Sequence, residues 1–294
     1  MCGIVGLFIK DRAMEPELGS LLSDMLITMT DRGPDSAGIA VYGSSDPDRS
    51  KIVVQSFTPD ADFGALEEAL GGDCVLNVKD SHAVIELPES ELEQTRGLIE
   101  TDFSSIRIIS AGSVIEIYKE VGLPKDVVKR FDIASMHGTH GIGHTRMATE
   151  SAVTTLGAHP FSTALDQCLV HNGSLSNHNK LRRELVREGM TFETENDSEV
   201  AAAYLTSRMA HGMNLAEALE SGLQALDGFY TFVVGTRSGF GVLRDPIACK
   251  PAVLAETDRY VAFGSEYRAL AVLPGIDGAK VWEPEPATVY FWER

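Results

Sequence analysis

Short apolar runs recur along the whole chain, and most of them are too short to form a helix. Runs of four to eight apolar residues, bounded by Gly, Pro, Asn or Asp, are typical of buried β-strands. On this pattern we predict strands at residues 4–9, 39–42, 52–55, 83–86, 114–118, 169–172, 229–235, 241–243, 252–255, 260–263 and 288–291.

Fewer segments have the spacing of an amphipathic helix, with apolar residues three and four positions apart. We predict helices at residues 16–30, 90–99, 180–189, 198–209 and 215–226. In the fourth of these, Val200, Tyr204 and Leu205 give one packed face together with the alanines between them. Two stacked sheets flanked by helices would bury so many short strands, so we expect an α+β fold.

Residues 48–113 form an acidic stretch between two of the predicted strands. The stretch has strand and helix signals of its own, including a helix start near Pro88 and Glu89. We therefore expect one domain over residues 1–294 with an inserted subdomain at 48–113. The insert is interpreted either as an elaboration of the surface or as a docking surface for a partner subunit, and no residue in it suggests catalysis.

Cys2 follows the initiator methionine, and its side chain is small enough for Met1 to be removed. Removal would leave a thiol and a free α-amine on one residue. An unperturbed α-amine has a pKa of about 7.7–8.0, so near neutral pH part of it can accept the thiol proton. Cys2 is thus a candidate nucleophile whose base is the chain terminus. If Met1 is retained, that base is lost, and a cysteine here can also occur by chance.

Four further motifs supply partners for such a nucleophile. They are TDRGPDSAG at residues 30–38, GIGHTRMAT at 141–149, HNG at 171–173 and NDSE at 196–199. Together with CGIVG at 2–6, and in this order, they resemble the class II glutamine amidotransferases, a family of N-terminal-nucleophile hydrolases. The resemblance covers residues 1–47 and about 114–270. It implies a four-layer αββα sandwich of the N-terminal-nucleophile hydrolase type, with the insert as a small added subdomain.

The resemblance also implies how the matching residues would hydrolyse glutamine. Cys2 would form a γ-glutamyl thioester and release ammonia. The side-chain N–H of Asn172 and the backbone N–H of Gly173 would form the oxyanion hole, where one donor is typically worth about 100–1000-fold in rate. Apart from the resemblance, hydrolysis of an amide requires a nucleophile and an oxyanion hole, which these groups would supply.

Substrate binding falls to a second set of residues. Arg146 has the planar guanidinium that pairs bidentately with a carboxylate, here the α-carboxylate of glutamine. Asp197 would face the substrate's ammonium group. Thr149 and Arg32 are expected to support binding, and the Gly-, Ser- and Thr-rich stretch 150–161 would close over the substrate as a lid.

Each of these residues also has a purely structural interpretation. Asn172 and Gly173 could form a turn, because Asn-Gly is the strongest short hairpin signal. Arg146 could be an ordinary salt-bridged arginine, and Arg32 could form an ion pair with Asp35. Asp197 could cap the helix that follows it, because Asp is a strong N-cap.

Composition narrows the class of partner. The chain has 25 basic and 43 acidic side chains, a formal net charge of −18, which would repel phosphate backbones; we expect no nucleic-acid partner. No apolar run approaches the roughly 20 residues needed to cross a bilayer, so we expect no membrane association and a cytoplasmic protein. The four cysteines show no CxxC spacing, and we expect neither a metal nor a cofactor in this chain.

The sequence leaves no room for a synthase domain beyond the amidotransferase motifs, so we expect ammonia to pass to a separate subunit of a hetero-oligomer. In length and in the position of its insert, the chain resembles the stand-alone amidotransferase subunit of N-methylglutamate synthase and of glutamate-synthase-like complexes. That resemblance implies a partner subunit with flavin and iron–sulfur groups. Two alternatives stay open: an N-terminal-nucleophile hydrolase of another amide, and a non-catalytic regulatory subunit with the same fold.

Overall fold

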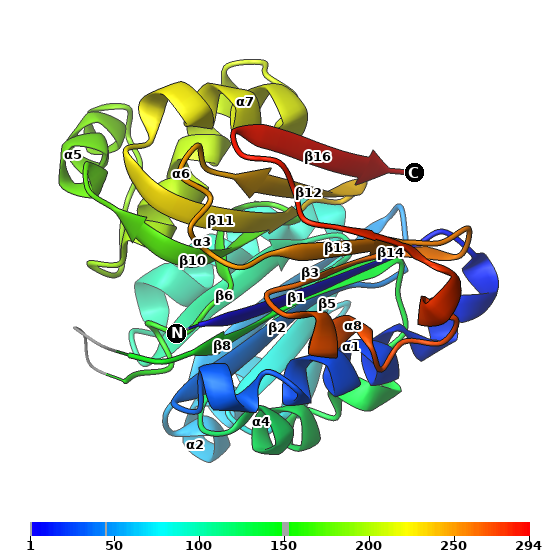
Figure 1. Cartoon of the computed structure of the whole chain (residues 1–294). Helices are drawn as coiled ribbons and strands as arrows, with labels where there is room; N and C mark the ends of the chain where they lie inside the picture. Colours follow the sequence, from blue (N-terminus) through cyan, green and yellow to red (C-terminus); the bar gives the residue numbers. More distant parts are fainter. Residues whose placement is uncertain (1, 45, 149–152) are drawn as a thin grey trace.

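Two antiparallel sheets stacked face to face form the body of the protein (Figure 1). The computed structural model describes residues 2–44, 46–148 and 153–294. The first sheet has, in spatial order, strands β15 (Lys280–Trp282), β13 (Val253–Glu256), β14 (Tyr260–Gly264), β1 (Gly3–Ile9), β8 (His140–Arg146), β2 (Ser36–Tyr42) and β7 (Ile115–Val121). The second has β16 (Thr288–Glu293), β12 (Gly239–Arg244), β11 (Gly228–Gly235), β10 (Gln167–Leu175) and β9 (Phe161–Ala164).

Helices cover the outer faces of both sheets. The first sheet carries α1 (Leu18–Ile27), α4 (Pro124–Arg130) and α8 (Tyr267–Leu270). The second carries α6 (Asp197–Ala210) and α7 (Leu215–Ala225), with α5 (His178–Arg187) packed against α6. The predicted four-layer α+β sandwich is therefore confirmed.

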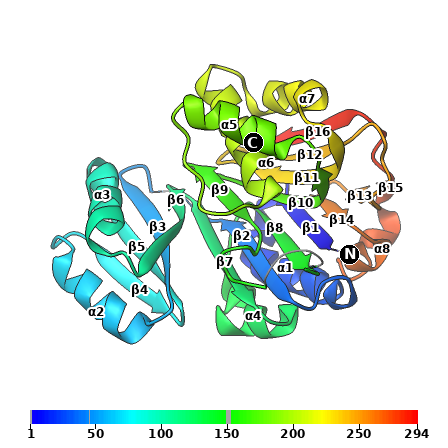
Figure 2. The ribbon, with the colours of Figure 1, turned by 90° about the vertical axis from the view of Figure 1, so that its left-hand side faces the viewer.

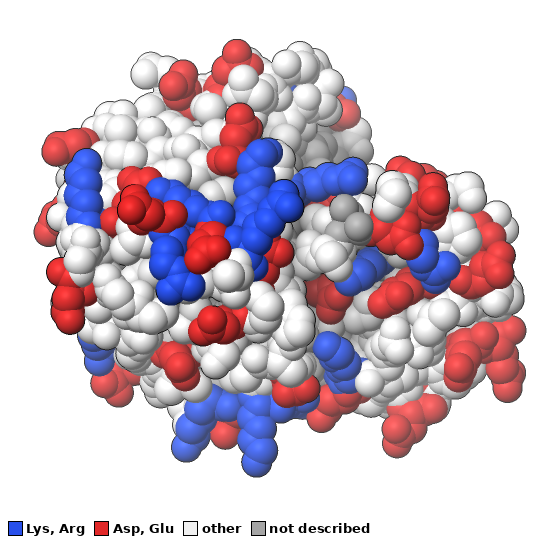
Figure 3. All heavy atoms as spheres, turned by 90° about the vertical axis from the view of Figure 1, so that its right-hand side faces the viewer, with Lys and Arg blue, Asp and Glu red and all other residues white. Residues whose placement is uncertain are grey.

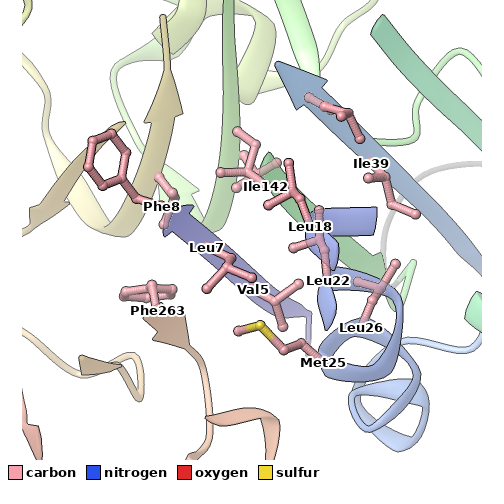
Figure 4. Close-up of a cluster of buried hydrophobic side chains, with 14 of the residues drawn as sticks. Val5, Leu7, Phe8, Leu18, Leu22, Met25, Leu26, Ile39, Ile142 and Phe263 are labelled. Atoms are coloured by element: carbon pink, nitrogen blue, oxygen red, sulfur yellow. The ribbon is translucent and has the colours of Figure 1, made fainter. Parts of the chain in front are cut away.

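The core is organised around β1, whose seven residues are all buried at the centre of the first sheet. One face of α1 packs on β1 and β8, as Figure 4 shows for Leu18, Leu22 and Leu26. A Cβ on Gly141 would lie 2.7 Å from Leu22, and one on Gly143 would lie 3.0 Å from Leu26. The glycines of β8 thus make room for the leucines of the helix.

Residues 49–112 form a separate lobe beside the body (Figure 2). Its elements are β3 (Arg49–Ser56), α2 (Pro59–Ala69), β4 (Val75–Lys79), β5 (His82–Pro88), α3 (Leu92–Asp102) and β6 (Ile106–Gly112). The βαββαβ connectivity and the antiparallel order β4-β5-β3-β6 are those of a ferredoxin-like sheet. Both helices pack on one face of this sheet over a small core of their own, which includes Phe63, Leu66 and Ile99. Asp and Glu predominate on its surface, at the right of Figure 3.

The exit of this insert is anchored to the body by one carboxylate. Asp166, in the turn between β9 and β10, accepts hydrogen bonds from the backbone N–H groups of Ser113, Val114 and Ile115 at 2.9–3.1 Å. The Ser113 hydroxyl adds a fourth at 2.9 Å. Four bonds to one buried carboxylate fix how β7 leaves the insert and joins the first sheet.

The structure extends and corrects the predicted elements. All eleven predicted strands are present, but the pattern missed β4, β6, β8, β9 and β15, and also the helices α2, α4 and α8. The helix predicted at 16–30 starts later, because Pro16 lies in a 3-10 helix, Arg12–Glu17, and α1 begins at Leu18. Strand β8 was missed because Gly141, Gly143, His140 and His144 interrupt the apolar run that would signal a strand.

Two glycines provide a test of this packing. A Cβ on Gly38, in β2, would lie 2.0 Å from the carbonyl oxygen of His159, so Gly38→Ala should lower the free energy of unfolding by at least about 2 kcal/mol. Gly64, inside α2, has no atom within 4 Å of that position, so Gly64→Ala should raise it by about 0.5–1 kcal/mol. Urea denaturation measures both, and a similar effect of the two changes would contradict this packing.

Candidate active site

Cys2 lies directly before β1, at the edge where three strands of the first sheet end together. Gly3 of β1 is opposite Thr145 of β8, and Ser36 of β2 is opposite Arg146. Because β1 and β8 are antiparallel neighbours, Cys2 and Arg146 leave the sheet side by side. Figure 1 shows the chain entering β1 at this edge. The strand register therefore brings the candidate nucleophile next to the candidate carboxylate-binding residue.

Two side chains hold the backbone carbonyl of Cys2. The Nε of Arg32 donates to this oxygen at 2.9 Å, and the Nδ2 of Asn172 donates to it at 3.3 Å. Arg32 is 7% exposed, and its Nη1 pairs with the Glu266 carboxylate at 2.6 Å. The Cys2 side chain itself is partly exposed. These contacts fix the start of the chain.

The interpretation of Arg32 and Asp35 as an ion pair is wrong. Asp35 instead accepts a hydrogen bond from the backbone N–H of Ala148 at 2.8 Å, while Arg32 has turned to Cys2 and Glu266. Glu266 lies 234 positions away in the sequence, so local spacing could not have revealed this partner.

Asn172 and Gly173 lie within β10 and not in a turn, so the hairpin interpretation is wrong. Asn172 is opposite Thr231 of β11, and Gly173 is opposite Tyr230. Gly173 has a φ of +155°, and a Cβ there would lie 2.0 Å from the carbonyl oxygen of Phe229. Only glycine fits this backbone, which turns the strand next to the amide that contacts Cys2.

Asp197 is the first residue of α6, but it does not cap the helix. The cap is Asn196, whose side-chain oxygen accepts from the Ser198 N–H at 2.9 Å, so the capping interpretation of Asp197 is wrong. The Asp197 carboxylate accepts from the Leu175 N–H at 2.8 Å and lies 3.7 Å from Nδ1 of His171. Burial raises the pKa of Asp197, but His171 and the Leu175 N–H outweigh it and lower this pKa to about 2.

Three buried histidines lie between the sheets and α6, a feature the sequence interpretation did not assign. The Ser198 hydroxyl joins Nε2 of His159 at 2.8 Å to Nδ1 of His171 at 2.9 Å. His144 stacks on His159 and bonds through its Nε2 to the carbonyl of His171 at 3.0 Å. Burial lowers the pKa of His144 to about 3 and that of His159 well below its usual value, so both rings are neutral. Part of the signal was present, because His144 lies in the GIGHTRMAT motif, His171 in HNG and Ser198 in NDSE.

Arg146, the last residue of β8, is 7% exposed. A Cβ on Gly157 would lie 3.1 Å from its Nη1, so the segment 153–160 packs directly against the guanidinium. Part of the predicted lid at 150–161 is therefore seen beside Arg146. Thr149 and residues 150–152 of that lid lie outside the described residues.

A cavity of about 650 Å³ opens elsewhere, between the insert and the body. Its walls come from α3, β6, β9, α6 and the loop between α5 and α6, together with Lys119 of β7 and Leu156. None of Cys2, Arg146, Asn172, Gly173 and Asp197 lines it. Within the described ranges, His, Cys, Asp and Glu form no group of three that could hold a metal ion. Nor does any described helix combine the length and the apolar character needed to cross a membrane.

Comparison with known proteins agrees with this geometry. Residues 144–272 match a family model described as a glutamine amidotransferase domain. The chain is 67% identical over its whole length to the glutamine amidotransferase-like protein GlxB of Rhizobium meliloti, covering 99% of that protein. It is 33% identical to a putative glutamine amidotransferase of Methanothermobacter thermautotrophicus, with both chains covered completely. The chain belongs to the class II glutamine amidotransferase family.

Solved structures of two other proteins have the same fold as this chain. Glutamine phosphoribosylpyrophosphate amidotransferase of B. subtilis superposes on 99% of the chain with a TM-score of 0.64 and 19% identity. A structure described as the allosteric regulatory enzyme of purine biosynthesis gives a TM-score of 0.66, also at 19% identity. The chain spans 47% of the length of each, so the likeness extends to the fold alone.

The lowered pKa of Asp197 predicts a pH-dependent contribution to the stability of the amidotransferase. The carboxylate is better stabilised in the folded chain, where its pKa is about 2, than in the unfolded chain, where it is 3.8. Its contribution, about 2 kcal/mol, should be complete above pH 4 and be lost as the pH falls towards 2. The difference in urea-unfolding free energy between the wild type and Asp197→Asn should therefore shrink over this range.

The matched control is Asp258→Asn, which makes the same change at an exposed turn. An equal pH dependence of both variants would show that the environment of Asp197 adds no stability.

Proposed function

We propose that the chain hydrolyses L-glutamine to glutamate and ammonia through a thioester on Cys2. The observation that carries this proposal is the bond from Asn172 to the carbonyl of Cys2. It joins the start of β1 to the middle of β10, so the candidate nucleophile and the candidate oxyanion donors come together from the two stacked sheets.

The chemistry needs only groups that this edge supplies. After removal of Met1, the free α-amine accepts the thiol proton, and the Cys2 sulfur bonds to the side-chain amide carbon of glutamine. The negative charge that develops on the amide oxygen is stabilised by N–H donors of Asn172 and Gly173. The C–N bond then breaks, the nitrogen takes the proton and leaves as ammonia, and water hydrolyses the thioester to glutamate and the free thiol.

Recognition of a free amino acid follows from two oppositely charged side chains. Arg146 would pair with the α-carboxylate and Asp197 with the ammonium group, which the low pKa of Asp197 keeps possible well below neutral pH. Both side chains are mostly shielded from water, and ion pairs are stronger when they are shielded from water. A peptide substrate has neither charge at the residue being attacked, which favours glutamine over a peptide. Arg32, whose Nη2 is buried without an acceptor in the described chain, and Thr149 would support binding.

The ammonia would pass to a separate synthase subunit. On sequence resemblance, this is a subunit of N-methylglutamate synthase or of a similar glutamate-synthase-like complex, with flavin and iron–sulfur groups on the partner. The assembly would be a cytoplasmic hetero-oligomer. The insert, which stands beside the body with its own core, supports this proposal as a surface on which such a partner could dock.

Covalent labelling tests the glutaminase assignment without needing the partner's substrate. Treatment with 6-diazo-5-oxo-L-norleucine, an electrophilic glutamine analogue, should modify a Cys2 peptide that lacks Met1, and excess glutamine should protect it. Peptide mass spectrometry reads the site. Cys249, which is exposed, serves as the internal control for unspecific reaction. An adduct on Cys249 alone, or none on protein shown by mass to lack Met1, would contradict the assignment, as would unchanged labelling of Cys2→Ser.

Arg146→Lys tests recognition of the α-carboxylate. A lysine keeps the charge but replaces a bidentate fork by a single point, so the KM for glutamine should rise about tenfold or more while kcat changes little. Glutaminase assays over a range of glutamine concentrations separate the two constants. Arg259→Lys, at an exposed arginine paired with Asp11, is the matched control. An unchanged KM would remove Arg146 from the binding site.

A further inference from the structure

We propose that Lys119 and Glu120 of β7 are positioning residues for the glutamine site: they hold the segment 153–160 in place and connect it to the insert. The inference rests on the proposed glutaminase function and extends it to residues that no sequence motif contains. β7 is the strand by which the chain returns from the insert to the body.

Lys119 binds the segment through its backbone. Its Nζ donates to the carbonyl of Ala158 at 3.0 Å and to that of Pro160 at 3.2 Å, and it lies 4.8 Å from the centre of the Phe161 ring. The side chain is 5% exposed and makes no ion pair within the described residues. Burial lowers the pKa of Lys119 to about 8, against the attraction of Glu193 and Glu199. Two carbonyls therefore take the place of the usual carboxylate partner.

Glu120, the next residue, joins the segment to the insert. One carboxylate oxygen accepts a short hydrogen bond from the Thr155 hydroxyl. The other accepts from the hydroxyl of Ser81 at 3.1 Å and lies 3.5 Å from Arg130, which pairs in turn with Asp80 at 2.5 Å. Asp80 and Ser81 form the turn between β4 and β5 of the insert. One carboxylate thus touches both the insert and the segment.

The other side of the segment meets the two groups assigned to glutamine. Gly157 packs against the guanidinium of Arg146. His159 bonds to Ser198, which bonds in turn to His171 beside Asp197. A change in the position of residues 153–160 would therefore alter the surroundings of both Arg146 and Asp197, the groups proposed to bind the α-carboxylate and the ammonium of glutamine.

These contacts predict an effect on binding and not on the chemical step. If the segment is held less firmly, a smaller fraction of molecules has the site arranged for glutamine, and the apparent affinity falls by that fraction. Cys2, Asn172 and Gly173 are not touched by Lys119 or Glu120 in any described contact. We therefore expect KM to change and kcat to stay.

The experiment compares three variants on the full-length chain. Thr155→Val removes the hydroxyl on the segment side, Ser81→Ala removes the hydroxyl on the insert side, and Glu120→Gln changes the group between them. We expect KM for glutamine to rise about tenfold in Thr155→Val and Glu120→Gln, and about two- to fivefold in Ser81→Ala, with kcat within twofold of the wild type. In the Glu120→Gln background, the other two changes should add less than they do alone.

Ser110→Ala is the matched control, since Ser110 is also a buried serine of the insert but its hydroxyl has no partner in the described chain. An unchanged KM in both Thr155→Val and Glu120→Gln would overturn the proposal, and so would an equal rise in Ser110→Ala. Labelling of Cys2 in the wild type distinguishes a failure of the glutaminase function from a failure of the positioning role. If Cys2 is not labelled, the glutaminase function fails; if it is labelled but KM does not respond, only the positioning role fails.

Discussion

The arrangement of the site depends on how the start of the chain is held. A chain terminus is ordinarily free to move, yet the carbonyl of Cys2 is bound by Arg32 from one side and by Asn172 from the other. The same amide group that fixes the terminus belongs to the residue pair proposed to stabilise the oxyanion. Nucleophile and oxyanion donors are therefore positioned by one contact between the two sheets, and Glu266 keeps Arg32 oriented for it.

Beneath this contact the sheets and α6 are joined by hydrogen bonds between polar side chains and the backbone. His144 reaches from β8 to the backbone of β10, and Ser198 ties His159 and His171 to α6. The neutral rings of His144 and His159 suit this place, since a buried charge without a partner would cost several kcal/mol. Arg146 and Asp197 carry the charges proposed to pair with the charged groups of the substrate.

The sequence was sufficient for the architecture and for naming the candidate site residues, because both depend on local patterns. Apolar runs gave the strands, and the motifs gave Cys2, Arg146, Asn172, Gly173 and Asp197. What it could not give are partners set by the tertiary fold, such as the pairing of Arg32 with a glutamate 234 positions away. It also missed β8, because glycines that accommodate leucines of α1 weaken the strand signal while improving the packing.

The insert shows how an added lobe can matter without contributing a catalytic group. The Asp166 carboxylate fixes the backbone where the chain leaves the lobe, and β7 begins directly there. A shift of the lobe would therefore change the backbone conformation of only a few residues before β7. The lobe has its own core, and the cavity of about 650 Å³ separates part of it from the body. The lobe also contacts the body beyond β7, because Val53, Val84 and Ile109 belong to the main core and Asp80 pairs with Arg130 of α4. β7 is the strand whose side chains contact the segment beside Arg146. A shift of the lobe would reach the segment beside Arg146 through Glu120 of β7, which contacts both.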